Sequence, residues 1–272
     1  MTLDFNVELK HFPDNVPLAT TAAAIETWLD SLNISAVGAG LVPSGLVLDL
    51  PMDEGEGTTV FDRSGNDNDG DLNGCTWVDG KYGNALEFNG TTDYVNCGND
   101  ASLNIVDEIT IAFWLNPTVA EDELSVVLAS QDGWDGGICV RYQQGLVELY
   151  YNFEGIRYHL YTTTALTINT WTHCALVFKD PTHIYIYLNG IDKSGVISSA
   201  SVAHVFQELV IGAFGTTHDY NFQGVIDGVR IYNRALTLLE IKKLYYDRFQ
   251  DRQHKIKIQR KYGFYEVKVI YV

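Results

Sequence analysis

Residues 45–74 read GLVLDLPMDEGEGTTVFDRSGNDNDGDLNG, a short apolar run followed by a stretch dense in Asp, Asn and Gly. A helical calcium loop would need an acidic first ligand, Gly at position six and Glu at position twelve. With Gly70 at position six, the first position falls on Gly65 and the twelfth on Thr76. Neither residue supplies a carboxylate, so the dense stretch 62–74 predicts a sharp turn after a strand instead.

The same combination of an apolar run and a turn recurs from Gly45 onward. Each run is short, rich in β-branched and aromatic residues, and bounded by Gly, Asn, Asp or Pro, which is typical of β-strands. Many short strands at regular spacing predict an antiparallel sandwich. The runs are GLVLDL (45–50), EITIAFWL (108–115), LSVVLAS (124–130), GICVRY (137–142), LVELYYN (146–152), IRYHLYTTT (156–164), HCALVFK (173–179), HIYIYLNG (183–190) and ELVIGAF (208–214).

Composition supports the β assignment and narrows the partners. The 272 residues are 12% aromatic and include 24 Gly, which suits strands joined by tight turns. The formal net charge of −17 is uneven, since residues 1–229 hold 31 Asp and Glu against 7 Lys and Arg, whereas residues 230–272 hold 4 against 11. The acidic body repels polyanions and attracts cations, so we expect no nucleic acid partner, with contact through the basic tail as the alternative.

The N-terminal part differs from the strand-rich middle. Residues 20–32 predict a small amphipathic helix, because apolar side chains such as Ile25 and Leu29 recur at helical spacing. The Gly- and Pro-containing stretch 37–45 then predicts a linker. We therefore expect an N-terminal arm over residues 1–44.

The C-terminal part predicts a helix and a hairpin. Residues 236–249 have helical periodicity and close a main domain spanning residues 45–249. The remaining residues, 250–272, are basic and alternate polar with apolar side chains, as a β-hairpin does. Its turn is expected near Tyr262 and Gly263. This segment is predicted to be a basic β extension of the main domain.

Neither a signal peptide nor a membrane span is expected. The start, MTLDFNVELKHF, has no basic segment followed by an apolar one, and the apolar stretch 19–40 is interrupted by Glu26 and Asp30.

The cysteines are expected to be free, buried thiols, since an unexported chain meets a reducing compartment, and disulfides are the alternative. They lack CxxC spacing and stand far apart, which argues against zinc. The four are Cys75, Cys97, Cys139 and Cys174.

Six motifs, in order, resemble those of the concanavalin A-like, laminin-G-type jelly roll of bacterial, archaeal and phage proteins. The resemblance spans residues 45–245 and implies two antiparallel sheets packed face to face. Members of this family mostly act as carbohydrate-binding, adhesion or assembly modules. The motifs are GLVLDLPMDEGEGTTVFDRSGNDNDGDLNG (45–74), WVDGKYGNALEFNGTTDYV (77–95), DEITIAFWLNP (107–117), TWTHCALVF (170–178), IYLNG (186–190) and FQGVIDGVRIYNRALTLLEI (222–241).

The expected fold class is therefore all-β: a two-sheet antiparallel jelly-roll sandwich with a short N-terminal helical arm and a C-terminal helix plus β-hairpin extension. In such domains the DxSGNxNxG turn carries the chain across one end of the sandwich. Its glycines allow positive φ, and its Asp and Asn side chains bond neighbouring backbone amides.

The resemblance also implies a structural Ca²⁺ near this turn, held by backbone carbonyls, an acid from the first strand and another from the last. Because the first and last strands are neighbours in this topology, Asp53 and Asp227 are expected to converge. The candidate metal set is Asp53, Asp62, Asn66 and Asp227. The alternative is that these side chains only accept hydrogen bonds in turns.

Catalysis is not expected. A retaining glycoside hydrolase of this shape places two carboxylates on one strand, about 5 Å apart, and no strand here has that pattern. The acidic clusters 53–56 and 121–123 fall in turn-like contexts, and His173 follows Trp171 and Thr172 in a motif where a packed role is expected. There is no GxSxG, HExxH or phosphate loop.

Two regions offer the aromatic ring flanked by polar groups that sugar binding needs. In the loop SQDGWDGG (130–137), Trp134 is expected to be an exposed ring between Asp132 and Asp135. The second region is a strand.

Along residues 156–161, alternation predicts Arg157, His159 and Tyr161 on one face, with Tyr158 and Leu160 on the other. The alternative for most of these tyrosines is packing within the sheet.

These expectations combine into one functional hypothesis: a non-catalytic surface or adhesion component of a larger assembly, such as a phage or viral particle. It would reside in the virion or at an extracellular surface after cytoplasmic assembly. Its partners would be copies of itself or other assembly subunits, and cell-surface glycans. The arm and the hairpin would dock on neighbours, the hairpin by adding strands to a sheet edge. The alternatives are that both ends fold back on their own sandwich, and that the chain is a stand-alone carbohydrate-binding protein.

Overall fold

The computed structural model describes residues 43–119, 124–130, 137–201, 208–215, 217–246, 254–261 and 264–271. The chain divides into two compact units, Pro43–Tyr246 and a second formed by Met1–Val42 with Asp247–Val272. The expected N-terminal helix over residues 20–32 lies outside the described residues.

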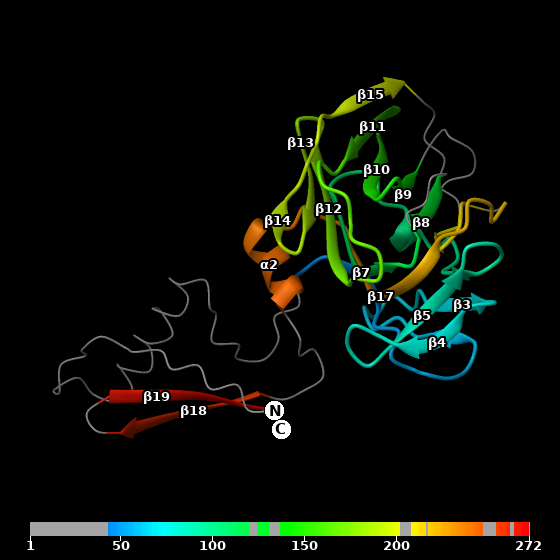
Figure 1. Ribbon diagram of the computed structural model, residues 1–272. Helices are drawn as coiled ribbons and strands as arrows, with labels where there is room; N and C mark the ends of the chain where they lie inside the picture. The colour runs from blue at the N-terminus through cyan, green and yellow to red at the C-terminus, as the bar shows by residue number, and fades with distance from the viewer. Residues whose placement is uncertain are drawn as a thin grey trace. The chain divides into compact units, whose positions relative to one another are not determined.

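The unit Pro43–Tyr246 is a sandwich of two antiparallel sheets, as the expected jelly roll requires (Figure 1). The first sheet has the strand order β14-β13-β12-β7-β17-β5-β4, and β1 also pairs with β17. Its strands are β1 (Leu46–Leu50), β4 (Thr76–Asp79), β5 (Asn84–Asn89), β7 (Ile109–Pro117), β12 (Thr172–Asp180), β13 (His183–Leu188), β14 (Ile191–Asp192) and β17 (Gln223–Tyr232).

The second sheet has the order β15-β11-β10-β9-β8-β16-β6-β3-β2. A short 3₁₀ helix, η1 (Ala101–Leu103), precedes β7. The strands are β2 (Thr59–Val60), β3 (Gly70–Asn73), β6 (Tyr94–Asn96), β8 (Ser125–Ala129), β9 (Ile138–Gln143), β10 (Leu146–Phe153), β11 (Ile156–Tyr161), β15 (Ser198–Ser201) and β16 (Val210–Ile211).

The first and last strands of the sandwich are neighbours, which confirms the expected topology. β1 runs antiparallel to the second half of β17, with Leu50 opposite Val229, while the first half of β17 pairs with β5. The register of β17 against β7 shifts between Asp227 and Arg230, where Gly228 has a φ of 58°. This irregularity lets one strand serve two neighbours and points Asp227 at the turn before β5.

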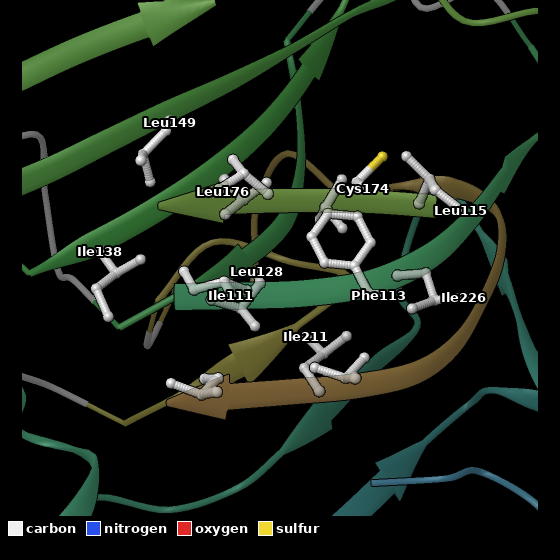
Figure 2. Packing of buried hydrophobic residues seen from close by; sticks show 14 of the residues in the cluster. Ile111, Phe113, Leu115, Leu128, Ile138, Leu149, Cys174, Leu176, Ile211 and Ile226 are labelled. Carbon is white, nitrogen blue, oxygen red and sulfur yellow. The ribbon is translucent and has the colours of Figure 1, made fainter. Parts of the chain in front are cut away.

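The core lies between the two sheets, because alternate residues of each strand point inward (Figure 2). On β7, Ile111, Phe113 and Leu115 face the interior, and they meet Leu128 and Leu149 of the second sheet. All five are almost completely buried. This apolar layer supplies the main driving force for folding.

The helix α2 (Leu238–Tyr246) covers the outer face of the first sheet (Figure 1). Ile241 and Leu244 pack against Ala112, Val177 and other side chains that point away from the core. The described helix falls within the predicted range 236–249. None of the described helical segments has the length and apolar content that crossing a bilayer requires.

All four cysteines are free, as expected, and only Cys75 is not fully buried. His173 is 3% exposed and packs against Trp114 and Tyr245, so the expected packed role is confirmed. Burial, together with the charge of Arg230, lowers its pKa to about 3, which keeps the imidazole neutral.

In the second unit the structure describes a two-stranded hairpin, β18 (His254–Lys261) and β19 (Phe264–Tyr271). The strands pair antiparallel from His254 opposite Tyr271 to Lys261 opposite Phe264. The predicted hairpin is therefore present.

Candidate functional site

The Asp- and Asn-rich turn is held by its own side chains. The Asp62 carboxylate accepts hydrogen bonds from the backbone amides of Asp49 (2.9 Å), Ser64 (2.9 Å) and Asn68 (3.0 Å). Asn66 donates its amide to the Val47 carbonyl at 3.2 Å. These bonds cover the free edge of β1, so the turn fastens the first strand.

Asp53 and Asp227 lie beside a second turn, residues 80–84, which leads into β5. One oxygen of Asp227, Oδ2, accepts from the amides of Lys81 (2.8 Å) and Tyr82 (3.2 Å). Asp53 Oδ1 accepts from the amide of Asn84 at 3.2 Å. Burial raises the pKa of Asp227 to about 7, and the charge of Asp53 adds to this effect.

Two carboxylates lie at this turn, and carboxylate oxygens are the ligands that a hard cation prefers. A Cβ at Gly83 would collide with the Asp53 carboxylate, and one at Gly80 would lie 2.9 Å from Asp227 Oδ2, so glycines let the backbone approach both acids. Within the described residues, no group of three or more His, Cys, Asp or Glu side chains gathers to hold a metal. An ion here would rely on two carboxylates and backbone carbonyls, which suits Ca²⁺.

The structure thus brings Asp53 and Asp227 to one turn and places Asp62 and Asn66 in another. The convergence of the two acids follows from the pairing of β1 with β17.

A stacked row of side chains crosses the outer face of the second sheet. The rings of Tyr150 on β10 and His159 on β11 are parallel within 14°, with centroids 4.1 Å apart. The Arg141 guanidinium on β9 lies 3.7 Å from the Tyr150 centroid. Because β10 lies between β9 and β11, Arg141 and His159 approach Tyr150 from opposite sides. We call Arg141, Tyr150, His159 and Tyr161 the stacked ladder.

Tyr161, at the end of the stacked ladder, is the one ring of the ladder that is classed as exposed. Tyr161 lies 5.7 Å from His159 and is 39% exposed. Polar groups lie beside the neighbouring His159: Glu148 Oε2 is 3.7 Å from His159 Nε2, and the exposed Ser198 hydroxyl is 3.4 Å from His159 Nδ1. The Arg157 guanidinium lies 5.7 Å from the Tyr150 ring.

On its other side the stacked ladder continues into a small apolar cluster. Tyr150 packs against Cys139 and Phe214, among other residues of this cluster. Phe214 contacts the ring of Tyr220, which is 44% exposed. Tyr220 and His218 both have a φ of 54°, which is uncommon for residues other than Gly.

The strand residues predicted to bind ligand, Arg157, His159 and Tyr161, share the outer face of β11, whereas Tyr158 and Leu160 are buried. The loop candidates Asp132, Trp134 and Asp135 lie outside the described residues.

Sequence reasoning missed Tyr150, Glu148 and Tyr220 as candidates. Alternation along β10 places Glu148 and Tyr150 on one face, a signal available in the sequence. The register that sets Tyr150 opposite His159 could not be predicted from the sequence.

A family model described as the concanavalin A-like lectin/glucanases superfamily matches residues 89–242. Among curated protein sequences, none matches significantly.

Solved structures share the fold at low sequence identity. The binding domain of Paraclostridial mosquitocidal protein 1 superposes with a TM-score of 0.61 and 18% identity, over 80% of this chain and 55% of that one. Domain 4 of AbnA, a GH43 extracellular arabinanase from Geobacillus stearothermophilus in complex with arabinotriose, superposes with a TM-score of 0.58 and 22% identity, over 74% of this chain and 98% of that one. Trypanosoma rangeli sialidase in complex with sialic acid superposes with a TM-score of 0.58 and 17% identity, over 86% of this chain and 39% of that one.

Proposed function

Because the chain belongs to the concanavalin A-like lectin/glucanases superfamily, we propose that its jelly roll is a non-catalytic carbohydrate-binding module whose site is the stacked ladder. The observation that carries the proposal is the row of rings and charged groups on the outer face of β9, β10 and β11. Sugars present apolar CH faces that stack on rings, and hydroxyls that need donors and acceptors beside the ring.

The ladder assigns different roles to its members. Tyr150 is covered from both sides by Arg141 and His159, so it orders these groups rather than stacking on a sugar. Tyr161, at the exposed end, offers the stacking surface. Arg157, Glu148 and the hydroxyl of Ser198 supply hydrogen-bonding groups near it. The AbnA domain that shares this fold is described in complex with arabinotriose, which supports a sugar ligand by analogy of fold alone.

The chemistry around the ladder favours binding over hydrolysis. Glu148 is the sole carboxylate in the sequences of β9, β10 and β11. A retaining glycosidase needs two carboxyl groups about 5 Å apart, and an inverting enzyme needs two somewhat farther apart. His159 already lies beside Glu148, so this acid is suited to orienting a ligand hydroxyl.

For the whole protein, we propose a role as a surface or adhesion component of a larger assembly, such as a phage or viral particle. Its partners would be copies of itself or other assembly subunits, and cell-surface glycans. The basic hairpin outside the jelly roll supports this role, because binding a sugar does not require it. A stand-alone carbohydrate-binding protein is the alternative.

Calcium would have a structural role in this module. Asp53 and Asp227 would hold the ion, which would neutralise two neighbouring acids and fix the turn 80–84 against β17.

The glycan site is tested by substituting Tyr161. A glycan array identifies a ligand, and calorimetry then compares Tyr161→Ala with Tyr246→Ala, a ring of 69% exposure on α2 that serves as the matched control. Loss of one stacking ring is expected to weaken binding about tenfold, with no change for the control. Equal affinity of both variants would show that the ladder is not the site.

The same ligand should be measured with Trp134→Ala. Loss of binding in this variant, with Tyr161→Ala unaffected, would place the site in the loop 130–137 instead.

A further inference from the structure

Two exposed rings lie at the ends of one line across the outer face of the second sheet. Tyr161, on β11, is 39% exposed, and Tyr220, which follows β16 in the chain, is 44% exposed. The residues between them are paired across neighbouring strands, so they form one row perpendicular to the strands. The paired positions, from one end of the row to the other, are Tyr161, Glu148, Arg141, Val126 and Asn221.

The ring of Tyr220 lies on the same face of the sheet as the stacked ladder. It meets the ring of Phe214 edge-on, with the two centroids 5.9 Å apart. Phe214 packs with Val126 and Cys139 in the apolar cluster that Tyr150 of the ladder also contacts, and this cluster is separate from the core between the sheets. Both exposed rings are therefore open to a ligand that approaches this face.

The backbone around Tyr220 is held in one conformation. Tyr220 and His218 both have a φ of 54°, a region that costs conformational energy and persists where the surroundings fix it. Here the amide of Val126 donates to the Tyr220 carbonyl at 2.7 Å. The His218 ring stacks on Tyr94, with centroids 3.8 Å apart and ring planes within 6°. A ring placed in this way loses little conformational entropy when a ligand binds.

The separation of the two rings sets the size of the ligand that can use both. The row passes from β11 to β10, β9 and β8, and then to residues 220–221, which makes four steps between neighbouring segments. At about 4.8 Å for each step, the ends of the row are about 19 Å apart. A single sugar stacks on one ring and cannot reach the other. A linear chain of several sugars can reach both.

We propose that the ligand of this face is a linear oligosaccharide that runs across the strands, with one sugar stacked on Tyr161 and another, several units along the chain, on Tyr220. Acidic side chains that can accept hydrogen bonds from sugar hydroxyls lie near both ends, Glu148 beside Tyr161 in the row and the exposed Asp219 beside Tyr220 in the chain. This inference rests on the proposed function and adds the class of ligand: an extended glycan chain, not a single terminal sugar.

The test compares short and long members of the same oligosaccharide series on the full chain. The probes are linear oligosaccharides of three and six units printed on a glycan array, arabinotriose and arabinohexaose among them, and calorimetry then measures the series that the wild type retains. The wild type should bind the hexasaccharide more tightly than the trisaccharide. Tyr220→Ala should weaken hexasaccharide binding about tenfold and leave trisaccharide binding unchanged, because the shorter chain does not reach this ring. Tyr161→Ala should weaken both.

Unchanged trisaccharide binding also shows that Tyr220→Ala is folded, and Tyr220→Phe, which keeps the ring, should bind the hexasaccharide like the wild type. The exposed Tyr246→Ala on α2 is the matched control and should change neither affinity. Equal wild-type affinity for both lengths, or a Tyr220→Ala variant that weakens neither length or both alike, would overturn the extended site. If Tyr161→Ala still weakens both lengths in that case, the ladder remains the glycan site. A Tyr161→Ala variant without effect, or a wild type that retains no series, would overturn the proposed function as well.

Discussion

Asp227 lies where β17 changes its neighbour, and its position creates an energetic conflict. Its side chain is 3% exposed, and the carboxylate of Asp53 is close enough to oppose its ionisation. Two backbone amides favour the charged form but do not offset burial. Binding a proton or a cation would offset the cost of this buried negative charge, and the two differ in their dependence on pH.

We predict that without calcium the stability conferred by Asp227 falls as pH rises. Its folded pKa is about 7 against 3.8 for an ordinary carboxyl group, so the folded chain binds the proton more tightly than the unfolded chain. The contribution is complete below about pH 4 and is lost as pH rises through about pH 7. Urea unfolding in a chelator should show this decline in the wild type and a smaller one in Asp227→Asn.

Calcium should reverse the decline at neutral pH, because the ion replaces the proton. The melting temperature of the wild type should rise on adding calcium and that of Asp227→Asn should not. A wild-type melting temperature that changes neither with calcium nor with chelator would exclude the ion from this site.

At this scale the sequence was informative for some residues and not for others. Asp53 and Asp227 were paired in advance because the resemblance supplied the strand order. The two faces of β11 followed from alternation. The stacking of Tyr150 on His159 depends on cross-strand register, which the turn between β10 and β11 sets and local pattern does not.

Helix α2 begins with a reciprocal cap that joins it to the strand before it. The Glu240 carboxylate accepts from the amide of Thr237 at 2.9 Å and from both terminal nitrogens of Arg234 at 2.6 Å and 3.1 Å. The hydrogen bond with Arg234 lowers the pKa of Glu240 to about 2. The same carboxylate therefore caps the helix and anchors the end of β17.

We predict that Glu240→Gln lowers the free energy of unfolding by about 1 kcal/mol at neutral pH. Because the folded pKa lies below that of an ordinary carboxyl group, this contribution is present above about pH 4.5 and is lost as pH falls towards 2. Denaturant unfolding measures it, with the exposed Glu56→Gln as control. Equal effects of the two substitutions would show that the cap adds nothing.

The longer elements were predictable and the shortest were not. The runs that became β7, β10, β12 and β13 are long enough for their pattern to identify a strand. β2 and β14 have 2 residues each, and neighbouring strands create them more than their own composition. The run 208–214 yielded a β16 of 2 residues, because Gly212 has a φ of 84° and a Cβ there would collide with Phe88.

At the scale of the whole molecule, the jelly roll has a core of its own, whereas the hairpin belongs to the other unit. The two therefore have separate sources of stability, and losing one need not unfold the other.

We predict that deleting residues 251–272 leaves a folded jelly roll that no longer joins the assembly proposed above. The described core between the two sheets is formed by residues of the unit Pro43–Tyr246, so the circular dichroism spectrum of the sandwich and its cooperative unfolding should persist. Sedimentation velocity should show that the truncated chain no longer forms the oligomer of the full-length chain. Unfolding of the truncated chain would show that the hairpin belongs to the core, and normal assembly of the truncated chain would place the contact elsewhere.

The pairing of β1 with β17 has a mechanical consequence for the surface attachment proposed above. The chain enters the jelly roll beside its exit from the sheet, where the amide of Asn233 donates to the carbonyl of Gly45 at 2.8 Å. Tension applied before β1 and after β17 would pull this pair apart from one end, breaking its hydrogen bonds in succession instead of loading them together. Such a sandwich resists force better when it is tethered through one flank only, with the load passing from that flank to the bound ligand.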